Sequence, residues 1–125
     1  MRILLANQYP ETRLALTLLF GREPGACIVG SVGNAAGLLA LAHTVQPDIV
    51  ILDLNLPGAP VAETLDNLRF FNKSIKILLI SAGLNPAEAT QSPRVDAAID
   101  HSDPPEVLLE AFHALRESND LAIQR

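Results

Sequence analysis

The segment Asp48–Leu54 reads DIVILDL and is the most continuous apolar and β-branched run in the chain. A run of this kind, with no alternation of apolar and polar residues, is typical of a strand that is covered on both faces. Sheets that are covered on both faces are usually parallel, with helices on each side. The segment therefore predicts the central strand of a parallel α/β sheet, and its apolar run is interrupted near its end by one carboxylate, Asp53.

Other short apolar runs lie on either side of this strand in the sequence, separated by segments with helical spacing. Strands are expected at Arg2–Ala6, Cys27–Val32, Ile75–Ile80 and Asp96–Asp100, and helices at Pro10–Phe20, Ala35–Val45, Ala62–Phe71 and Glu106–Arg116. Segment 85–95 is polar and has a proline near each end, so only a shortened helix fits there. The alternation predicts an α/β fold: a doubly wound, five-stranded parallel sheet of order 2-1-3-4-5, with right-handed crossovers.

The composition limits the classes of function. The chain has 125 residues, the size of one domain, and a net charge of −5. This acidic balance, with 4% aromatic residues, argues against a nucleic-acid-binding surface. The single cysteine, Cys27, excludes an internal disulfide and a multi-cysteine metal site, and its apolar neighbours predict a buried position. No apolar stretch has the length of a signal peptide core or a membrane span, so we expect a cytoplasmic protein without membrane contact.

Polar side chains follow the predicted strands at the edge where a sheet of this order binds its ligands, which is the carboxyl end of the strands. They belong to Asn7, Gln8, Asp53, Ser81 and His101. We expect all five to converge on one crevice. A lone carboxylate in such a crevice either caps its own loop or serves as a phosphoryl acceptor or metal ligand.

Several segments resemble one known family. PDIVILDLNLPG (47–58) resembles the third strand and following loop of the receiver domains of two-component response regulators, the CheY-like family. RILLANQYP, CIVGSVGNAAGLLALA and ILLISAG are similar to the family's first, second and fourth strands with their adjoining segments. AAIDHSDPPEVLLEAFHAL (97–115) resembles receivers of regulators that often carry a C-terminal helix-turn-helix domain. The resemblance implies a receiver domain over residues 1–117, with a tail or the start of a linker at 118–125.

Matched position by position, the sequence keeps only part of the family's site. The resemblance places Asp53 at the phosphoacceptor position and Ser81 at the switch hydroxyl position. Asn7 and Gln8 stand where the family has an acidic pair, and His101 stands where it has a lysine. The chain is therefore expected to be an atypical receiver.

These replacements have chemical consequences for a phosphorylation site. Amides offer only neutral oxygens, whereas Mg²⁺ prefers anionic ones, and a histidine does not supply the fixed cation of a lysine. We expect no cofactor and weak or absent Mg²⁺ binding, with Asp53 and the Asn55 backbone carbonyl as the remaining candidate ligands. Two neighbouring positions also depart from the family, because Ala98 replaces a usual aromatic residue and Val61 a usual glycine.

The sequence leads us to expect a non-enzymatic signalling module that acts by protein–protein interaction and has a degenerate phosphorylation site. Its partner would be a sensor kinase or another signalling protein, and the apolar face of the last helix could support a homodimer. Two alternatives stay open. One is a working receiver that is phosphorylated slowly on Asp53, and the other is a flavodoxin-like small-ligand binder or enzyme. A separate hypothesis is that His101 forms an ion pair with Asp53 at acidic pH.

Overall fold

A computed structural model describes residues 1–81 and 95–124 of the chain. Five strands form one parallel sheet of order β2-β1-β3-β4-β5. The strands are β1 (Arg2–Ala6), β2 (Cys27–Val32), β3 (Ile49–Asp53), β4 (Lys76–Ser81) and β5 (Ala97–Asp100). The helices are α1 (Pro10–Gly21), α2 (Ala35–Val45), α3 (Val61–Phe71) and α5 (Pro105–Gln124). The predicted fold class and strand order are confirmed, whereas the shortened helix expected at 85–95 falls almost wholly outside the described residues.

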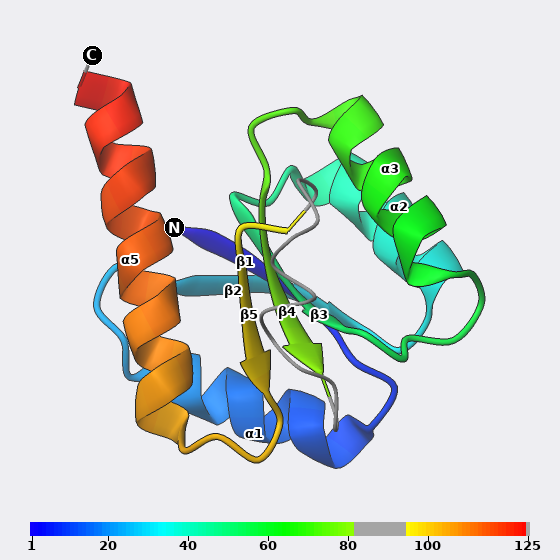
Figure 1. Cartoon of the computed structure of the whole chain (residues 1–125), viewed down its shortest axis with the longest axis horizontal. Coiled ribbons are helices and arrows are strands. Elements are labelled where there is room, and N and C mark those ends of the chain that lie inside the picture. Colours follow the sequence, from blue (N-terminus) through cyan, green and yellow to red (C-terminus); the bar gives the residue numbers. More distant parts are fainter. Residues whose placement is uncertain (82–94, 125) are drawn as a thin grey trace.

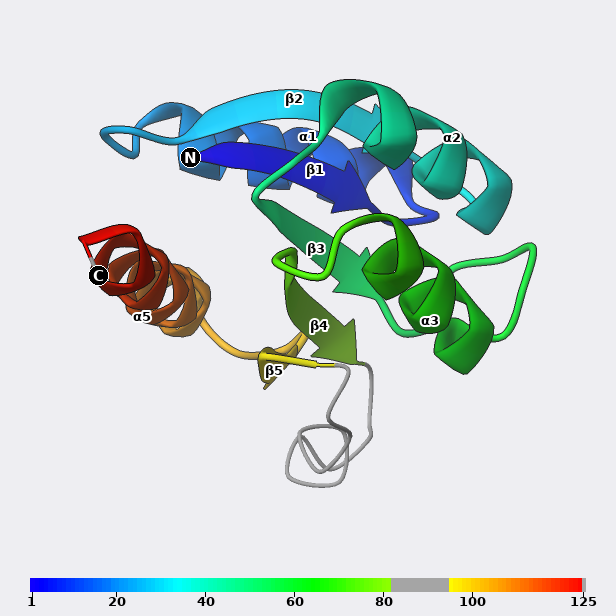
Figure 2. The same cartoon turned by 90° about the horizontal axis from the view of Figure 1, so that it is seen from above.

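The helices cover the two faces of the sheet in pairs (Figures 1 and 2), with α2 and α3 on one face and α1 and α5 on the other. Alternate side chains of β3 show this division directly. Val50 and Leu52 belong to the core cluster that contains the α2 and α3 side chains. Ile49 and Ile51 belong to the cluster that contains Phe20 of α1 and the apolar side chains of α5.

Strand β3 is buried along its whole length, as the continuous apolar run predicted. It pairs with β1 on one side and with β4 on the other, so its backbone has hydrogen-bonding partners at both edges. Full burial of a side chain such as Ile51 contributes about 1.5–3 kcal/mol to folding. The strand thereby fixes where its last residue, Asp53, can lie.

Two helix boundaries follow from local sequence. The side chain of Asn34 caps α2 by accepting a hydrogen bond from the Gly37 backbone N–H at 2.7 Å. Helix α5 ends at Gln124 rather than at the predicted Arg116, because no proline or glycine follows to stop it. The segment predicted as a tail or linker is thus largely helical, and the domain boundary after residue 117 stays a prediction. Within the part of the chain that the structure describes, no helix is long and apolar enough to cross a membrane.

The prediction that Cys27 is a buried core residue is wrong, because its side chain is exposed. The reason is its position in the sheet. Strand β2 is an edge strand, none of its residues is fully buried, and Cys27 is its first residue. Sequence around the cysteine shows an apolar run, but it does not show which strand lies at the edge.

We expect Phe112→Ala to lower the free energy of unfolding by about 3–5 kcal/mol, because it removes a fully buried ring and leaves a cavity. The ring packs edge-on against Phe20, with centroids 5.1 Å apart. Phe70, which is 79% exposed, provides the control, and Phe70→Ala should change the free energy by no more than about 0.5 kcal/mol. Urea unfolding followed by circular dichroism measures both. Equal losses for the two variants would contradict this account of the core.

Candidate functional site

The arrows of β1, β3 and β4 point toward one edge of the sheet (Figure 2). By their position in the sequence, the predicted site residues lie at or just after the ends of the strands. Strand register brings Asp53 opposite Ile80, so the ends of β3 and β4 are neighbours. The backbone bonds that follow continue this alignment. Leu54 N–H donates to the Ile80 carbonyl at 2.9 Å, and His101 N–H donates to the Ser81 carbonyl at 2.7 Å.

Burial separates the five predicted side chains into two groups. Asn7, Asp53 and Ser81 are buried, with 5%, 8% and 1% of their surface exposed. They are three of the four buried polar residues in the described part of the chain. Gln8 is half-buried, whereas the side chain of His101 is 65% exposed. Asn7, Asp53 and Ser81 are thus buried at or just after the ends of β1, β3 and β4, whereas His101 is exposed just after β5, and the role of all of them as one site stays a prediction.

Asp53 is held by its own loop. Its Oδ1 accepts a hydrogen bond from the Asn55 backbone N–H at 3.0 Å, which fixes the turn after β3. Among the described residues, no lysine, arginine or histidine forms an ion pair with this carboxylate. Asp53 is thus a buried carboxylate that is oriented by the backbone and has no cationic neighbour in ion-pair contact among those residues.

The side chain of Gln8 bonds to the Asn55 backbone carbonyl, whose oxygen the sequence singled out as a candidate metal ligand. Its Nε2 donates a hydrogen bond to the Asn55 backbone carbonyl at 3.2 Å. A carbonyl oxygen can only accept, so the nitrogen of the Gln8 amide must face it and the amide oxygen must turn away. A carboxylate at position 8 could not make this contact. The bond ties the loop after β1 to the loop after β3.

Asn7 is also committed to the backbone. Its side-chain Oδ1 accepts a hydrogen bond from the Tyr9 backbone N–H at 2.9 Å. Its backbone N–H donates to the Val32 carbonyl at 3.0 Å. This edge of the sheet therefore offers one carboxylate, Asp53, and two neutral amides, Asn7 and Gln8, as potential ligands. This donor set does not fit Mg²⁺, which prefers several hard anionic oxygens. Within the described residues, no group of three histidine, cysteine or acidic side chains is placed to hold a metal ion.

His101 pairs with its neighbour in the sequence. Its Nδ1 lies 3.0 Å from Oδ1 of Asp100, so the structure places it beside Asp100 rather than in the hypothesised ion pair with Asp53. The hydrogen bond from the Ser102 backbone N–H contributes most to holding the pKa of Asp100 below its ordinary value. The hydrogen bond with the His101 ring lowers this pKa further. The local contact follows from the turn after β5, which sequence spacing alone does not define.

The remaining positions have structural roles. The Ser81 hydroxyl donates to the Ile99 carbonyl at 3.3 Å and so joins β4 to β5. Val61 begins α3, and both Val61 and Ala98 pack against the core cluster under α2 and α3. The two departures from the family pattern outside the crevice are thus accommodated by ordinary packing.

Comparison with known sequences gives a consistent result. Residues 3–99 match the family model of the response regulator receiver domain. The nitrate/nitrite response regulator protein NarL of Escherichia coli K12 is 32% identical over 113 residues, which cover 89% of this chain and 52% of NarL. A putative transcriptional regulator of Pseudomonas aeruginosa PAO1 is 34% identical over 87 residues, or 70% of this chain and 41% of that protein. The chain spans about half, or less than half, of the length of these curated relatives.

Solved structures share the architecture. A LuxR-family two-component response regulator from Aurantimonas sp. SI85-9A1 is 28% identical, with a TM-score of 0.81 over 91% of this chain and 83% of that one. The isolated receiver domain of RcsB from Salmonella enterica serovar Typhimurium is 18% identical and shares the fold, with a TM-score of 0.85 over 94% of this chain and 88% of that one. The strand order, the polar edge and these matches together place the chain in the response regulator receiver domain family, among relatives of the NarL and LuxR type.

Proposed function

We propose that this receiver domain works through protein–protein contacts and does not depend on efficient, Mg²⁺-dependent phosphorylation of Asp53. One observation carries the proposal. The Gln8 amide donates to the Asn55 carbonyl, so the backbone oxygen left for a metal already has a partner from this chain. The partner is uncharged, and it stands at a position where the family has a carboxylate.

The chemistry of phosphoryl transfer explains why this matters. Transfer to a carboxylate depends mainly on positioning and on neutralising the charge that spreads over the phosphoryl oxygens. Asp53 is positioned by the Asn55 N–H, but the charge of the metal ligands has fallen to one carboxylate. His101 is exposed and paired with Asp100, so it does not supply a fixed cation beside Asp53. Neutralisation of the phosphoryl charge by a bound metal ion and by a fixed cation beside Asp53 is therefore weakened in both cases.

The proposed partners are proteins. A sensor kinase or another signalling protein would contact the domain, and we propose that the domain itself performs no catalysis and contacts no nucleic acid, given its net charge of −5. The names of its relatives point to transcriptional regulation, to which this domain would contribute by such contacts. A homodimer through α5 stays a prediction, because the buried apolar side chains of that helix already pack in the core.

One alternative remains within the same family. Asp53 and Ser81 are both present at the carboxyl edge, so a slow reaction with a phosphodonor is chemically conceivable. The match to the receiver family gives no support to the other alternative, a flavodoxin-like ligand binder or enzyme. The two receiver hypotheses differ in rate and extent of phosphorylation, which the first experiment measures.

Incubation of the chain with acetyl phosphate and Mg²⁺ should leave its intact mass unchanged, because the site lacks the charges that stabilise the transferring group. Intact-mass spectrometry over a time course measures the mass increase of one phosphoryl group. Asp53→Asn is the control for modification at any other residue. Rapid and near-complete modification that is absent from Asp53→Asn would contradict the proposal, whereas slow and partial modification would support the alternative.

The combined variant Asn7→Asp, Gln8→Asp, His101→Lys should bind Mg²⁺ more tightly by about tenfold or more and should gain phosphorylation on Asp53. Two unit charges about 4 Å apart interact by about 4 kcal/mol near a protein surface, and about 1.4 kcal/mol corresponds to a tenfold change. Amide NMR shifts during a Mg²⁺ titration measure the binding.

A single variant separates charge from hydrogen bonding in this test. Gln8→Ala frees the Asn55 carbonyl without adding a carboxylate, so it should leave Mg²⁺ binding weak. If Gln8→Ala binds Mg²⁺ as well as the combined variant does, the missing charges are not the reason for weak binding.

A further inference from the structure

A cavity of about 480 Å³ opens between α1 and the corner where β5 leads into α5. It lies on the face of the sheet opposite to α2 and α3. Ala15 and Leu19 of α1, Ile80 and Ile99 at the strand ends, and Leu108 of α5 supply its apolar walls. The volume and the largely apolar lining are those of small-molecule binding sites in general.

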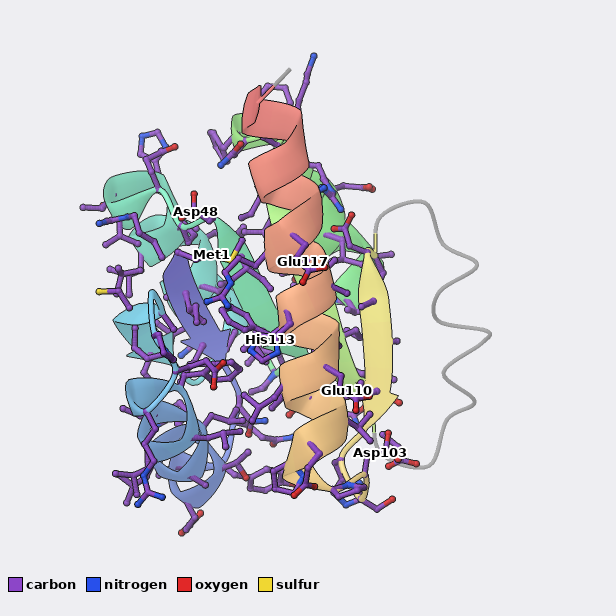
Figure 3. The ribbon with its side chains drawn as sticks, turned by 90° about the vertical axis from the view of Figure 1, so that its left-hand side faces the viewer. Met1, Asp48, Asp103, Glu110, His113 and Glu117 are labelled. Atoms are coloured by element: carbon purple, nitrogen blue, oxygen red, sulfur yellow. The ribbon has the colours of Figure 1, made fainter. Side chains whose placement is uncertain are left out.

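The packing of the two helices explains why space remains there. Helices α1 and α5 meet at the Phe20–Phe112 ring contact, and the next residue of α5, His113, bonds Glu23 just after α1. Figure 3 shows where His113 lies on α5. These contacts hold the middle of α5 near the end of α1. Ala15 of α1 and Leu108 near the start of α5 both line the space that remains between the two helices. The cavity opens at the surface of the fold, because Ala15 and Leu18, which line it, are exposed.

The polar groups that line the cavity differ in whether they already have hydrogen-bond partners. Asp103 accepts from the Asp100 N–H at 2.9 Å, and Asp100 accepts from the Ser102 N–H at 3.1 Å and lies beside His101. By contrast, Arg22 is exposed, and its guanidinium forms no hydrogen bond or ion pair within the described residues 1–81 and 95–124.

The lining residues of the cavity extend along α1, from Thr12 in its first turns to Arg22 just after its end, and ten residues of a helix span about 15 Å. A ligand of this shape would have an apolar body and one anionic end. The planar guanidinium matches a carboxylate in two parallel hydrogen bonds. Asp100 and Asp103 also line the cavity, and their carboxylates favour a monoanion over a dianion, because like charges repel.

We propose that this cavity binds a small amphiphilic monocarboxylate, with its apolar chain or ring along α1 and its carboxylate on Arg22. The site also touches the segment that is bonded to Ser81. Ile99 and His101 both line the cavity. The Ile99 carbonyl accepts a hydrogen bond from the Ser81 hydroxyl, and the His101 backbone N–H donates one to the Ser81 carbonyl. Occupancy would therefore be sensed at the carboxyl edge of the sheet by a route that is independent of phosphorylation at Asp53.

Titration of the full 125-residue chain with decanoate below its micelle concentration tests the proposal. Amide NMR signals of Ala15, Leu19, Ile99 and His101 should shift and saturate, with a Kd in the millimolar range or tighter for a probe of this size. Decan-1-ol, which lacks the charge, should bind about tenfold more weakly. Equal binding of the two probes would overturn the assignment of a carboxylate ligand.

Two matched pairs of variants locate the binding. Arg22→Gln should lower decanoate affinity to that of decan-1-ol, whereas Lys73→Gln, which removes an exposed charge outside the cavity, should not. Ala15→Trp should fill the cavity and abolish the shifts, whereas Ala40→Trp, at an exposed position of α2, should not. Both alanines are exposed, so the tryptophans do not enter the packed core, and far-UV circular dichroism verifies folding.

Three results would overturn the proposal. The first is the absence of saturable decanoate shifts in the wild-type chain, and the second is unchanged binding in Ala15→Trp. The third concerns Leu14 and Leu18, which are 61% and 63% exposed on the same helix and could instead contact a second copy of the chain. Sedimentation showing a dimer that Ala15→Trp dissociates, without any decanoate binding, would assign the cavity to a protein interface.

Discussion

The burial of β3 on both faces is the constraint on which the rest of the structure depends. Each of its five side chains must be covered, and alternate residues point to opposite faces. One pair of helices cannot satisfy this requirement, so α2 and α3 cover one face and α1 and α5 the other. The same burial leaves the carboxyl end of the strand as the place where a polar side chain, Asp53, meets the surface of the fold.

The polar edge combines one buried carboxylate with two amides that form hydrogen bonds within the chain. Three carboxylates in one crevice would repel one another unless a cation lay between them. In this chain neutral amides form internal hydrogen bonds instead, from Gln8 to the Asn55 carbonyl and from the Tyr9 N–H to Asn7. The loops after β1 and β3 are thereby joined without a metal. The arrangement satisfies buried polar groups from within the chain, which is what burial requires of them.

The fold could be predicted from sequence because its signals are strong and local. The continuous run in β3 and the Asn34 cap of α2 both specify structure through their own residues. The predicted boundaries agree with the observed ones to within one residue at every end except the end of α5, which lies eight residues later than predicted. The exposure of Cys27 could not be predicted in the same way, because it depends on which strand forms the edge of the sheet.

The candidate site was predictable in its members but not in its contacts. Strand ends place Asn7, Asp53 and Ser81 together whatever the loops do. The partner of each side chain depends on loop geometry, and so the pairing of His101 with Asp100 did not follow from spacing. The cavity beside α1 was also beyond sequence reasoning, since it arises from the packing of two helices that are distant in the chain.

The length of α5 has a mechanical consequence. The helix is continuous over 20 residues, about 30 Å, and extends beyond the sheet (Figure 1). Its base is the β5–α5 corner, and its middle is held against α1 by Phe112. A rod fixed in this way behaves as a lever. A tilt of about 5° about the Phe112 contact would displace the far end, Gln124, by roughly 1.6 Å, because the 12 residues between them span about 18 Å. Small changes at the corner are thus magnified with distance along the helix.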